Sequence, residues 1–293
     1  MCWDDGMVDP APTDTGRAPA DEPAARPAVR IAVAQRVPPR YGDPPALRRL
    51  ATAATDANGA DLLLVPELYP AGFRLDTDEL AELAESRESF AAHLGAVART
   101  HRIAIVAGYP ERGPDDTVYS SAIFVDADGT ELAHYRKLHL FGDETAAFGR
   151  GHQVPPVCRW RGWGVGLALC YDIEFPELAR LLADRGADLI CVPAGNMVGY
   201  SEVPEVLVPA RACENQVFVA YANYCNSDDE FDYDGHSVVA SPYGSLLAEA
   251  GQDEPQVLMV DLDPGLQAAA RAHNTHRNDR RHDVYRGPDP TIG

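Results

Sequence analysis

The chain has 293 residues, of which 45% are hydrophobic and 24% are charged, a composition typical of a globular protein with one large or two small domains. Its formal net charge of −20 at pH 7 creates a field that repels phosphate backbones and anionic membrane surfaces, which argues against nucleic-acid and membrane partners. No segment reaches the roughly 18 uninterrupted apolar residues that a membrane span requires, so we expect a soluble protein.

The first 29 residues are rich in proline, alanine and aspartate, and they contain six acids and two bases. This segment therefore carries a net charge of −4, and −16 remains on residues 30–293. It lacks the basic start and the apolar run of a signal peptide or membrane anchor. We predict a disordered N-terminal extension over residues 1–29, a folded domain over residues 30–286 and a short C-terminal tail over residues 287–293.

Short apolar runs rich in Val, Ile and Leu alternate with helical patterns along the chain. They begin at Arg30, Asp61, Arg102, Gly164, Asp188 and Val217. Such runs predict nearly continuous apolar strands in sheets that helices cover. Asp61 and Asp188 each follow a Gly-Ala pair and open a strand, which indicates two similar halves.

One helix and two hairpins are the clearest other elements. The helix is predicted from Asp76 to His101, with apolar residues close to helical spacing at Leu80, Leu83, Phe90, Leu94 and Val97. Strand-like runs around Asp128-Gly129 predict a hairpin within residues 117–137, and a Pro-Tyr-Gly turn predicts another from residue 237. Parallel βα units and antiparallel hairpins therefore coexist in one domain.

The cysteines do not form a disulfide or zinc pattern. The six are Cys2, Cys158, Cys170, Cys191, Cys213 and Cys225, and none belongs to a CxxC pair. We expect reduced thiols in a cytoplasmic enzyme.

Three polar residues close strand-like runs. Glu67 ends the run LLLVPE and Cys170 ends GVGLALC, so both are expected at the carboxyl edge of buried strands, where α/β sheets place their ligand sites. Lys137 closes the second strand of the first hairpin. Each residue alone has an ordinary alternative as a solvated cap, a surface charge or an inert packed thiol. Their combination favours one shared pocket.

The motifs PELYPAGF, YRKLHLFGDE and CYDIEFPE resemble the three catalytic blocks of the nitrilase superfamily of carbon-nitrogen hydrolases. The resemblance extends from about Arg30 to Tyr285. It implies a four-layer αββα sandwich that pairs through its outer helices into a homodimer or a higher homo-oligomer. Other segments are similar to the 5-aminopentanamidase group, which acts on ω-amino amides. Pro70, Ala71, Ala194 and Gly195 depart from that group's pattern and leave the detailed substrate open.

The same resemblance assigns the site residues. It implies a triad in which Cys170 forms a thioester, Glu67 is the general base and Lys137 stabilises the oxyanion together with the backbone N–H of Tyr171. A helix start and the lysine would favour the Cys170 thiolate. Glu144 resembles a second glutamate that orients the substrate, and Asn196 is expected to contact it. This scheme requires no metal and no organic cofactor.

Glu174 suggests which amide is cleaved. Cys-Tyr-Asp-Ile-Glu at the nucleophile, where nitrilases tend to have Cys-Trp-Glu, favours an amidase. The ω-amidase branch tends to place an arginine four residues after the cysteine, and here that residue is Glu174. We therefore expect a small cationic substrate, such as 5-aminopentanamide or 4-guanidinobutanamide, with residues 227–235 as a second acidic source. Glu174 as a helix cap and residues 227–235 as a solvated loop are the alternatives.

Other functions remain open on the sequence. The chain could act on a nitrile or a dicarboxylic acid monoamide, or it could be a non-catalytic nitrilase-like scaffold, although scaffolds usually lose a triad member. His134 and His139 flank Lys137 and suggest a Cys-His hydrolase, which we rank lower because both lie within the lysine motif. The histidine spacing in HNTHRNDRRH matches no common metal site, so that segment is predicted to be a basic surface.

Overall fold

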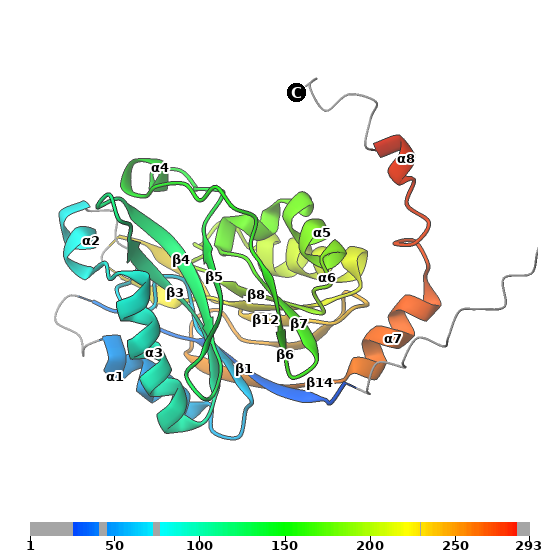
Figure 1. Cartoon of the computed structure of the whole chain (residues 1–293), viewed down its shortest axis with the longest axis horizontal. Helices are drawn as coiled ribbons and strands as arrows, with labels where there is room; N and C mark the ends of the chain where they lie inside the picture. The colour runs from blue at the N-terminus through cyan, green and yellow to red at the C-terminus, as the bar shows by residue number, and fades with distance from the viewer. Residues whose placement is uncertain (1–25, 41–45, 73–76, 229, 286–293) are drawn as a thin grey trace, which may run out of the picture.

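The computed structural model describes residues 26–40, 46–72, 77–228 and 230–285, and these form two six-stranded sheets packed face to face (Figure 1). The first sheet has the order β14-β1-β2-β3-β4-β5, with β1 Val29–Gln35, β2 Leu62–Leu64, β3 Ala104–Arg112, β4 Val118–Val125, β5 Glu131–Arg136 and β14 Gln256–Leu262. The second has the order β13-β12-β9-β8-β7-β6, with β6 Val157–Trp160, β7 Trp163–Leu167, β8 Leu189–Pro193, β9 Phe218–Ala222, β12 Val238–Ala240 and β13 Leu246–Glu249.

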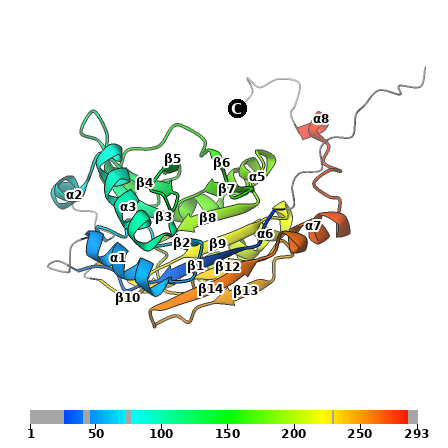
Figure 2. The same cartoon turned by 60° about the horizontal axis from the view of Figure 1, so that its bottom comes forward.

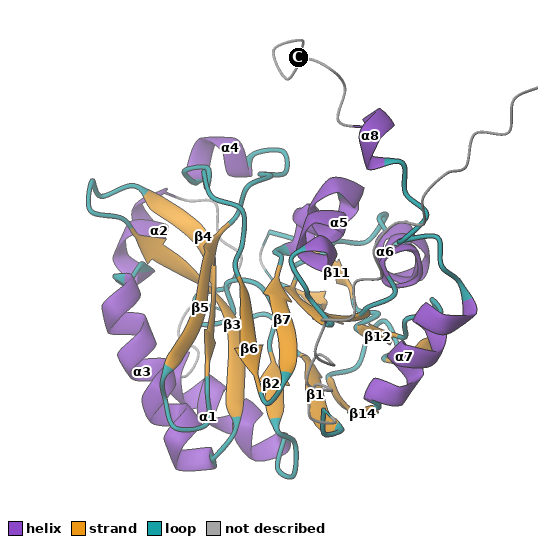
Figure 3. Cartoon of the chain, turned by 45° about the vertical axis from the view of Figure 1, so that its right-hand side comes forward, coloured by secondary structure: helices purple, strands orange, loops and turns teal. Residues whose placement is uncertain are grey.

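Helices cover the outer face of each sheet (Figures 2 and 3). The covering helices are α1 Ala46–Asp56, α2 Thr77–Leu83 and α3 Arg87–His101 on the first sheet, and α5 Pro176–Asp184 and α6 Val208–Asn215 on the second. The other helices are α4 Glu144–Ala147, α7 Pro264–His273 and α8 His282–Tyr285, and α8 lies apart from both sheets (Figure 1). One apolar core joins α1 and α3 to the first sheet, a second lies between the sheets, and a third joins α5 and α6 to the second sheet. The predicted αββα sandwich is therefore confirmed.

The two halves of the chain build their sheets alike. In each sheet three parallel strands, β1-β2-β3 or β7-β8-β9, carry antiparallel strands on both sides. Asp61 accepts a hydrogen bond from Arg30 N–H, and Asp188 accepts one from Gly164 N–H, each at 2.9 Å. Each of the two predicted halves thus has its own aspartate, Asp61 or Asp188, which joins the starts of two neighbouring strands.

Both predicted hairpins are present, but the predicted long helix is wrong. β4 and β5 pair around Asp128-Gly129, and β12 and β13 pair around the Pro-Tyr-Gly turn. Instead of one helix to His101, α2 ends at Leu83 and α3 begins at Arg87, because the Ser86 hydroxyl accepts a hydrogen bond from Ser89 N–H and caps a new helix. Leu83, one of the apolar residues at helical spacing, is 45% exposed.

Some sequence predictions concern residues outside the described ranges. These are most of the N-terminal extension, the start of the long helix at Asp76, and the tail from residue 286 onward. Within the described ranges, every helix is too short or too polar to cross a membrane.

Candidate active site

The fold brings Glu67, Lys137 and Cys170 to the same end of the two sheets. Glu67 lies three residues after β2, Lys137 directly follows β5, and Cys170 lies three residues after β7. The carboxyl ends of β2 and β7 meet here, as the sequence predicts. Glu67 and Lys137 are completely buried, and Cys170 is partly exposed at the surface of a pocket.

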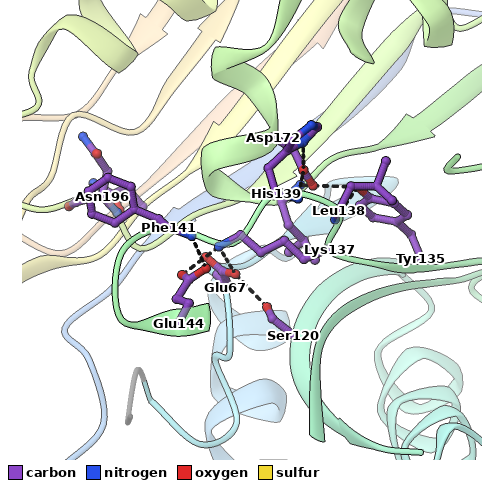
Figure 4. A network of polar contacts seen from close by, with 12 residues as sticks. Glu67, Ser120, Tyr135, Lys137, Leu138, His139, Phe141, Glu144, Asp172 and Asn196 are labelled. Carbon is purple, nitrogen blue, oxygen red and sulfur yellow. Dashed lines mark hydrogen bonds and ion pairs between the residues drawn. The ribbon is translucent and has the colours of Figure 1, made fainter. Parts of the chain in front are cut away.

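Lys137 lies between two carboxylates (Figure 4). Its Nζ donates to Glu67 Oε1 at 2.9 Å and to Glu144 Oε1 at 2.8 Å. Burial alone would lower the pKa of Lys137, but the two carboxylates raise it well above its ordinary value, so the side chain is an ammonium ion. Lys137 is also the only lysine of the chain, whose other basic residues are arginines.

The Glu67 carboxylate has one occupied and one available oxygen. Oε1 accepts hydrogen bonds from Ser120 Oγ at 2.7 Å and from Lys137, whereas Oε2 is buried and has no hydrogen-bond partner among the described residues. Burial raises the pKa of Glu67, and the nearby Glu144 raises it further, against the opposing effect of Lys137. A carboxylate with a raised pKa and a free oxygen is suited to accept a proton.

The surroundings of Cys170 oppose the thiolate more strongly than the helix start and the lysine favour it. Burial raises the pKa of the Cys170 thiol most, Glu67 raises it further, and Lys137 lowers it only in part. The expected helix start is also weaker than the sequence indicates, because Cys170 begins a 3₁₀ turn, Cys170–Glu174, and α5 begins only at Pro176. Cys170 has φ +40° and Leu68, next to Glu67, has φ +50°, so both loops hold a strained left-handed residue.

Asp172 is a site residue that the sequence analysis did not identify. It is fully buried, and its carboxylate accepts four hydrogen bonds, from Leu169 N–H, Tyr135 O–H, His139 N–H and His139 Nδ1 (Figure 4). Asp172 therefore links the loop of Cys170 to the segment on both sides of Lys137. Its position two residues after the cysteine was visible in the sequence, but its donors were not.

Neither flanking histidine serves as a base for Cys170. His139 pairs with Asp172 at 2.7 Å and stacks on Phe175, with 3.8 Å between the ring centroids. His134 pairs with Glu111 at 2.6 Å. Both imidazoles are thus engaged away from the thiol, which agrees with the lower rank of a Cys-His hydrolase.

A second unpredicted feature is the close approach of β3 to Glu67. A Cβ atom on Gly108 would lie 2.8 Å from Glu67 Cα and 2.9 Å from Leu68 N, so only glycine fits. Tyr224, which lies between β9 and β10, donates from its O–H to the Glu67 carbonyl at 2.8 Å. A glycine within a strand is the sequence signal that could have indicated this contact.

The pocket at Cys170 is small, with a cavity volume of about 20 Å³, and it contains most of the predicted substrate contacts. It is lined by Glu144 and Cys170 together with Phe141, Tyr171, Glu174, Asn196, Met197 and Tyr200. Asn196 Nδ2 donates to Tyr200 O at 3.0 Å, so its side-chain amide links two residues of the pocket wall. Phe141 meets the rings of Tyr171 and Tyr200 edge to face at centroid distances of 5.2 and 5.5 Å.

Acidic side chains gather at this pocket. Glu174 does not cap α5, whose N-cap is Phe175, so that alternative is wrong. Burial raises the pKa of Glu174, and the charge of Glu202 raises it further. Asp234 is 4% exposed, and its N–H donates to Asn196 O at 3.1 Å.

The acidic segment at 227–235 is a short hairpin where it is described, and Glu230 and Asp232 are exposed to solvent, as the solvated-loop alternative predicts for them. Its residues belong to a small antiparallel pair, β10 Cys225–Ser227 and β11 Asp232–Asp234, and Tyr233 forms a bridge to Met197 of the pocket wall. Within the described ranges, no group of three or more His, Cys, Asp or Glu side chains could hold a metal ion.

The chain is similar in sequence and in structure to known enzymes. The family model described as carbon-nitrogen hydrolase matches residues 30–272. A curated protein named hydrolase in pqqF 5'region, from Pseudomonas protegens, is 42% identical and covers 88% of this chain and 90% of its own length. An (R)-stereoselective amidase from Pseudomonas sp. is 39% identical and covers 80% and 84%.

Solved structures agree with the sequence relatives. The amidase from Nesterenkonia sp. has a TM-score of 0.75 at 39% identity, covering 87% of this chain and 97% of its own. A mutant of the amidase from Nesterenkonia sp. AN1 in complex with butyramide has a TM-score of 0.71 at 37% identity, with the same coverage. Another mutant of that enzyme carries the acetamide moiety of fluoroacetamide covalently at its active site cysteine, with a TM-score of 0.72 at 36% identity, covering 87% and 97%.

Proposed function

The chain belongs to the carbon-nitrogen hydrolase family of the nitrilase superfamily, and from this premise we propose that it hydrolyses small aliphatic amides with a cationic tail to a carboxylate and ammonia. The amidases among its relatives support the amide as the scissile group. The observation that carries the proposal is the buried pair of Glu67 and Lys137 beside the Cys170 thiol, with one Glu67 oxygen free.

In the first half-reaction Cys170 Sγ attacks the amide carbon while Glu67 Oε2 takes the thiol proton. This order suits a thiol whose resting pKa is raised, because the proton leaves only as the C–S bond forms. Lys137 Nζ and the Tyr171 N–H stabilise the oxyanion, at roughly 3 to 4 kcal/mol for a well-placed donor. Glu67 then gives its proton to the nitrogen, the C–N bond breaks, and ammonia leaves a thioester.

In the second half-reaction water replaces ammonia. Glu67 takes a proton from the water as it attacks the thioester, and the same proton returns to the thiolate when the C–S bond breaks. Glu144 positions Lys137 for both steps, because its Oε1 accepts from Nζ and its Oε2 accepts from Phe141 N–H at 2.9 Å. Glu144 also lines the pocket, so its carboxylate can contact and orient the substrate.

The lining of the pocket favours a cationic tail. Glu174 and Glu144 in the lining supply negative charge, and the rings of Phe141, Tyr171 and Tyr200 form an aromatic wall that can attract a cation through its π faces. A neutral short amide is the second candidate, because the amidase from Nesterenkonia sp. AN1 is described in complex with butyramide.

A substrate panel tests the proposed function. Ammonia release is measured from 5-aminopentanamide, 4-guanidinobutanamide, pentanamide, glutaramate and an ω-amino nitrile, with Cys170→Ala as the blank. Higher kcat/KM on the two cationic amides is expected. A preference for pentanamide would assign the neutral substrate, and preference for glutaramate or the nitrile would replace the proposed substrate while keeping the triad. No turnover of any member would favour the non-catalytic scaffold.

Replacing Glu174 by Arg is expected to lower kcat/KM for cationic amides by roughly 10- to 100-fold, since a charged contact contributes about 1.5 to 3 kcal/mol. Turnover of neutral pentanamide should change by less than about threefold. Glu177→Arg is the matched control, because Glu177 lies three residues away on the exposed side of α5. Equal losses on cationic and neutral amides would contradict a role of Glu174 in binding the tail.

Asp172→Asn is expected to lower kcat by roughly 100-fold with little change in KM. Four donors converge on the carboxylate, and an Asn side chain would turn an N–H₂ group against some of them, so the loops of Cys170 and Lys137 would shift. Displacement by about 1 Å costs this much in a catalytic group. A variant that loses stability but retains the parental kcat where it is folded would limit Asp172 to a structural role.

A further inference from the structure

A second cavity lies far from Cys170, at the opposite ends of the strands. Its charged lining consists of Arg26, Arg159, Asp188, Arg271 and Arg277, which we call the arginine cavity. Asp188 precedes β8 and accepts a hydrogen bond from Gly164 near the start of β7, whereas Cys170 follows the end of β7. Helix α7 contributes to the wall, and Figures 1 and 3 show α7 well separated from α4, which begins at Glu144.

Three guanidinium groups of the arginine cavity converge on one carboxylate. Arg26 pairs with Asp188 Oδ2, Arg271 Nη2 lies 3.3 Å from Oδ1, and Arg159 Nη1 lies 3.9 Å from Oδ2. Asp188 can neutralise only one of these three charges. Two positive charges therefore remain around it, in a chain whose formal net charge is −20.

Arg277 adds a fourth guanidinium that is only partly satisfied. It belongs to the C-terminal segment predicted as a basic surface, but its side chain is only 18% exposed. Nη1 donates to Asn215 O and Nη2 to Ala183 O, each at 3.0 Å, which ties it to the ends of α6 and α5. Its Nε is buried and lacks a hydrogen-bond partner within the part of the chain that the structure describes.

The electrostatics of these arginines agree with an unmatched positive charge. Burial lowers the pKa of Arg271, and Arg26 lowers it further, although Asp188 acts in the opposite direction. Burial likewise lowers the pKa of Arg277, with Arg271 as the next cause. Cations that repel one another in a partly buried cavity are stabilised by a bound anion.

We propose that the arginine cavity binds a phosphate group, as inorganic phosphate or as part of a phosphorylated small molecule. The planar forks of Arg26, Arg159 and Arg271 match the oxygens of a phosphate and can donate in pairs. The double negative charge of a phosphate dianion also balances the two positive charges that Asp188 leaves unmatched. Because the whole molecule repels anions, a single-charged ion such as chloride gains too little at this cavity to bind.

Binding is tested on the full chain by isothermal titration with sodium phosphate, sodium sulfate and a nucleoside diphosphate, with sodium chloride holding the ionic strength constant. The main variant is Arg159→Gln, because that side chain is 71% exposed and its one ion pair with a described residue is the 3.9 Å contact with Asp188, so its loss should not unfold the protein. Arg48→Gln, an exposed residue on α1 in the other half of the sandwich, is the matched control.

Phosphate is expected to bind the parent and Arg48→Gln alike and to bind Arg159→Gln at least tenfold more weakly. Tighter binding of the nucleoside diphosphate than of inorganic phosphate would identify an organic phosphate as the ligand, and equal binding would identify free phosphate. The proposal would be overturned if the heat of titration depended only on ionic strength and not on the anion. It would also be overturned if the parent and Arg159→Gln bound phosphate equally. Amide turnover by Arg159→Gln should equal that of the parent, because the cavity is remote from Cys170.

Discussion

Replacing Glu67 by Gln is expected to lower kcat/KM for amide hydrolysis by roughly 10³- to 10⁴-fold without unfolding the protein. General acid and base catalysis contributes about 10²- to 10⁴-fold, and Glu67 is proposed to serve both half-reactions. Gln has nearly the same shape, and its oxygen can keep the contacts that Ser120 and Lys137 now make with Oε1. The amide nitrogen would occupy the place of Oε2, which has no partner among the described residues.

The measurement combines steady-state ammonia release with the rate of alkylation of Cys170 by iodoacetamide. Both should fall in Glu67→Gln, since the thiol loses the group that accepts its proton. Ser120→Ala is the matched control, because it removes a hydrogen bond from the same carboxylate and keeps the base. A Glu67→Gln variant with more than a tenth of the parental kcat/KM would assign the base to another residue.

Replacing Lys137 by Met is expected to abolish amide turnover and to lower the free energy of unfolding by about 3 to 5 kcal/mol. Removing one member of a buried ion pair leaves its partners charged and desolvated, which is the origin of that cost. Here two carboxylates, Glu67 and Glu144, would remain in a site that excludes water. Turnover would fail because the oxyanion loses its cation.

The stability loss of Lys137→Met should depend on pH. Without the ammonium, burial and the charge of Glu144 raise the pKa of Glu67 in the folded state above its unfolded value. The folded variant then holds more protons than the unfolded chain, so its stability is greatest below about pH 4.5 and falls as the pH rises. Urea denaturation at pH 5 and pH 8 should show a larger difference from the parent at pH 8.

Because Lys137 is the only lysine, the parent itself offers a control for this variant. An amine-reactive reagent can modify only Lys137 and the chain's N-terminus, and Lys137 should resist it in the folded protein because its side chain is fully buried. A Lys137→Met stability loss that does not grow between pH 5 and pH 8 would contradict the inference that ionised, unpaired carboxylates destabilise the folded variant. An arginine could not replace the lysine simply, since its planar fork differs from a point charge between two acids.

Much of the fold follows from local sequence patterns. The apolar runs at Arg30, Asp61 and Asp188 form strands, and the Asp128-Gly129 turn joins β4 to β5. The long helix from Asp76 was predicted wrongly because its apolar spacing continues past Ser86, and spacing alone does not show that a serine hydroxyl caps a new helix there. The four layers came from the family resemblance, since composition does not specify how two sheets pack.

The candidate site was likewise predicted from the sequence only in part. The motifs containing Glu67, Lys137 and Cys170 were visible because each residue ends a strand-like run. Asp172, Ser120 and Gly108 were missed, because their roles depend on partners that lie on other strands and loops. The effect of burial and of Glu67, which raise the pKa of Cys170 against the lysine, was also missed, since burial is a property of the folded molecule.

By itself the sequence determined the family, the strands and the three motif residues, because these depend on the order of neighbouring side chains. Only the tertiary structure decided that Lys137 lies between two carboxylates, that Glu67 Oε2 has no partner in the described part of the chain and that Asp188 there pairs with three arginines. The physical reason is separation along the chain: Glu67 and Lys137 are 70 residues apart, and Arg271 and Asp188 are 83 apart. Distances, burial and charge coupling between such residues exist only once the two sheets have packed.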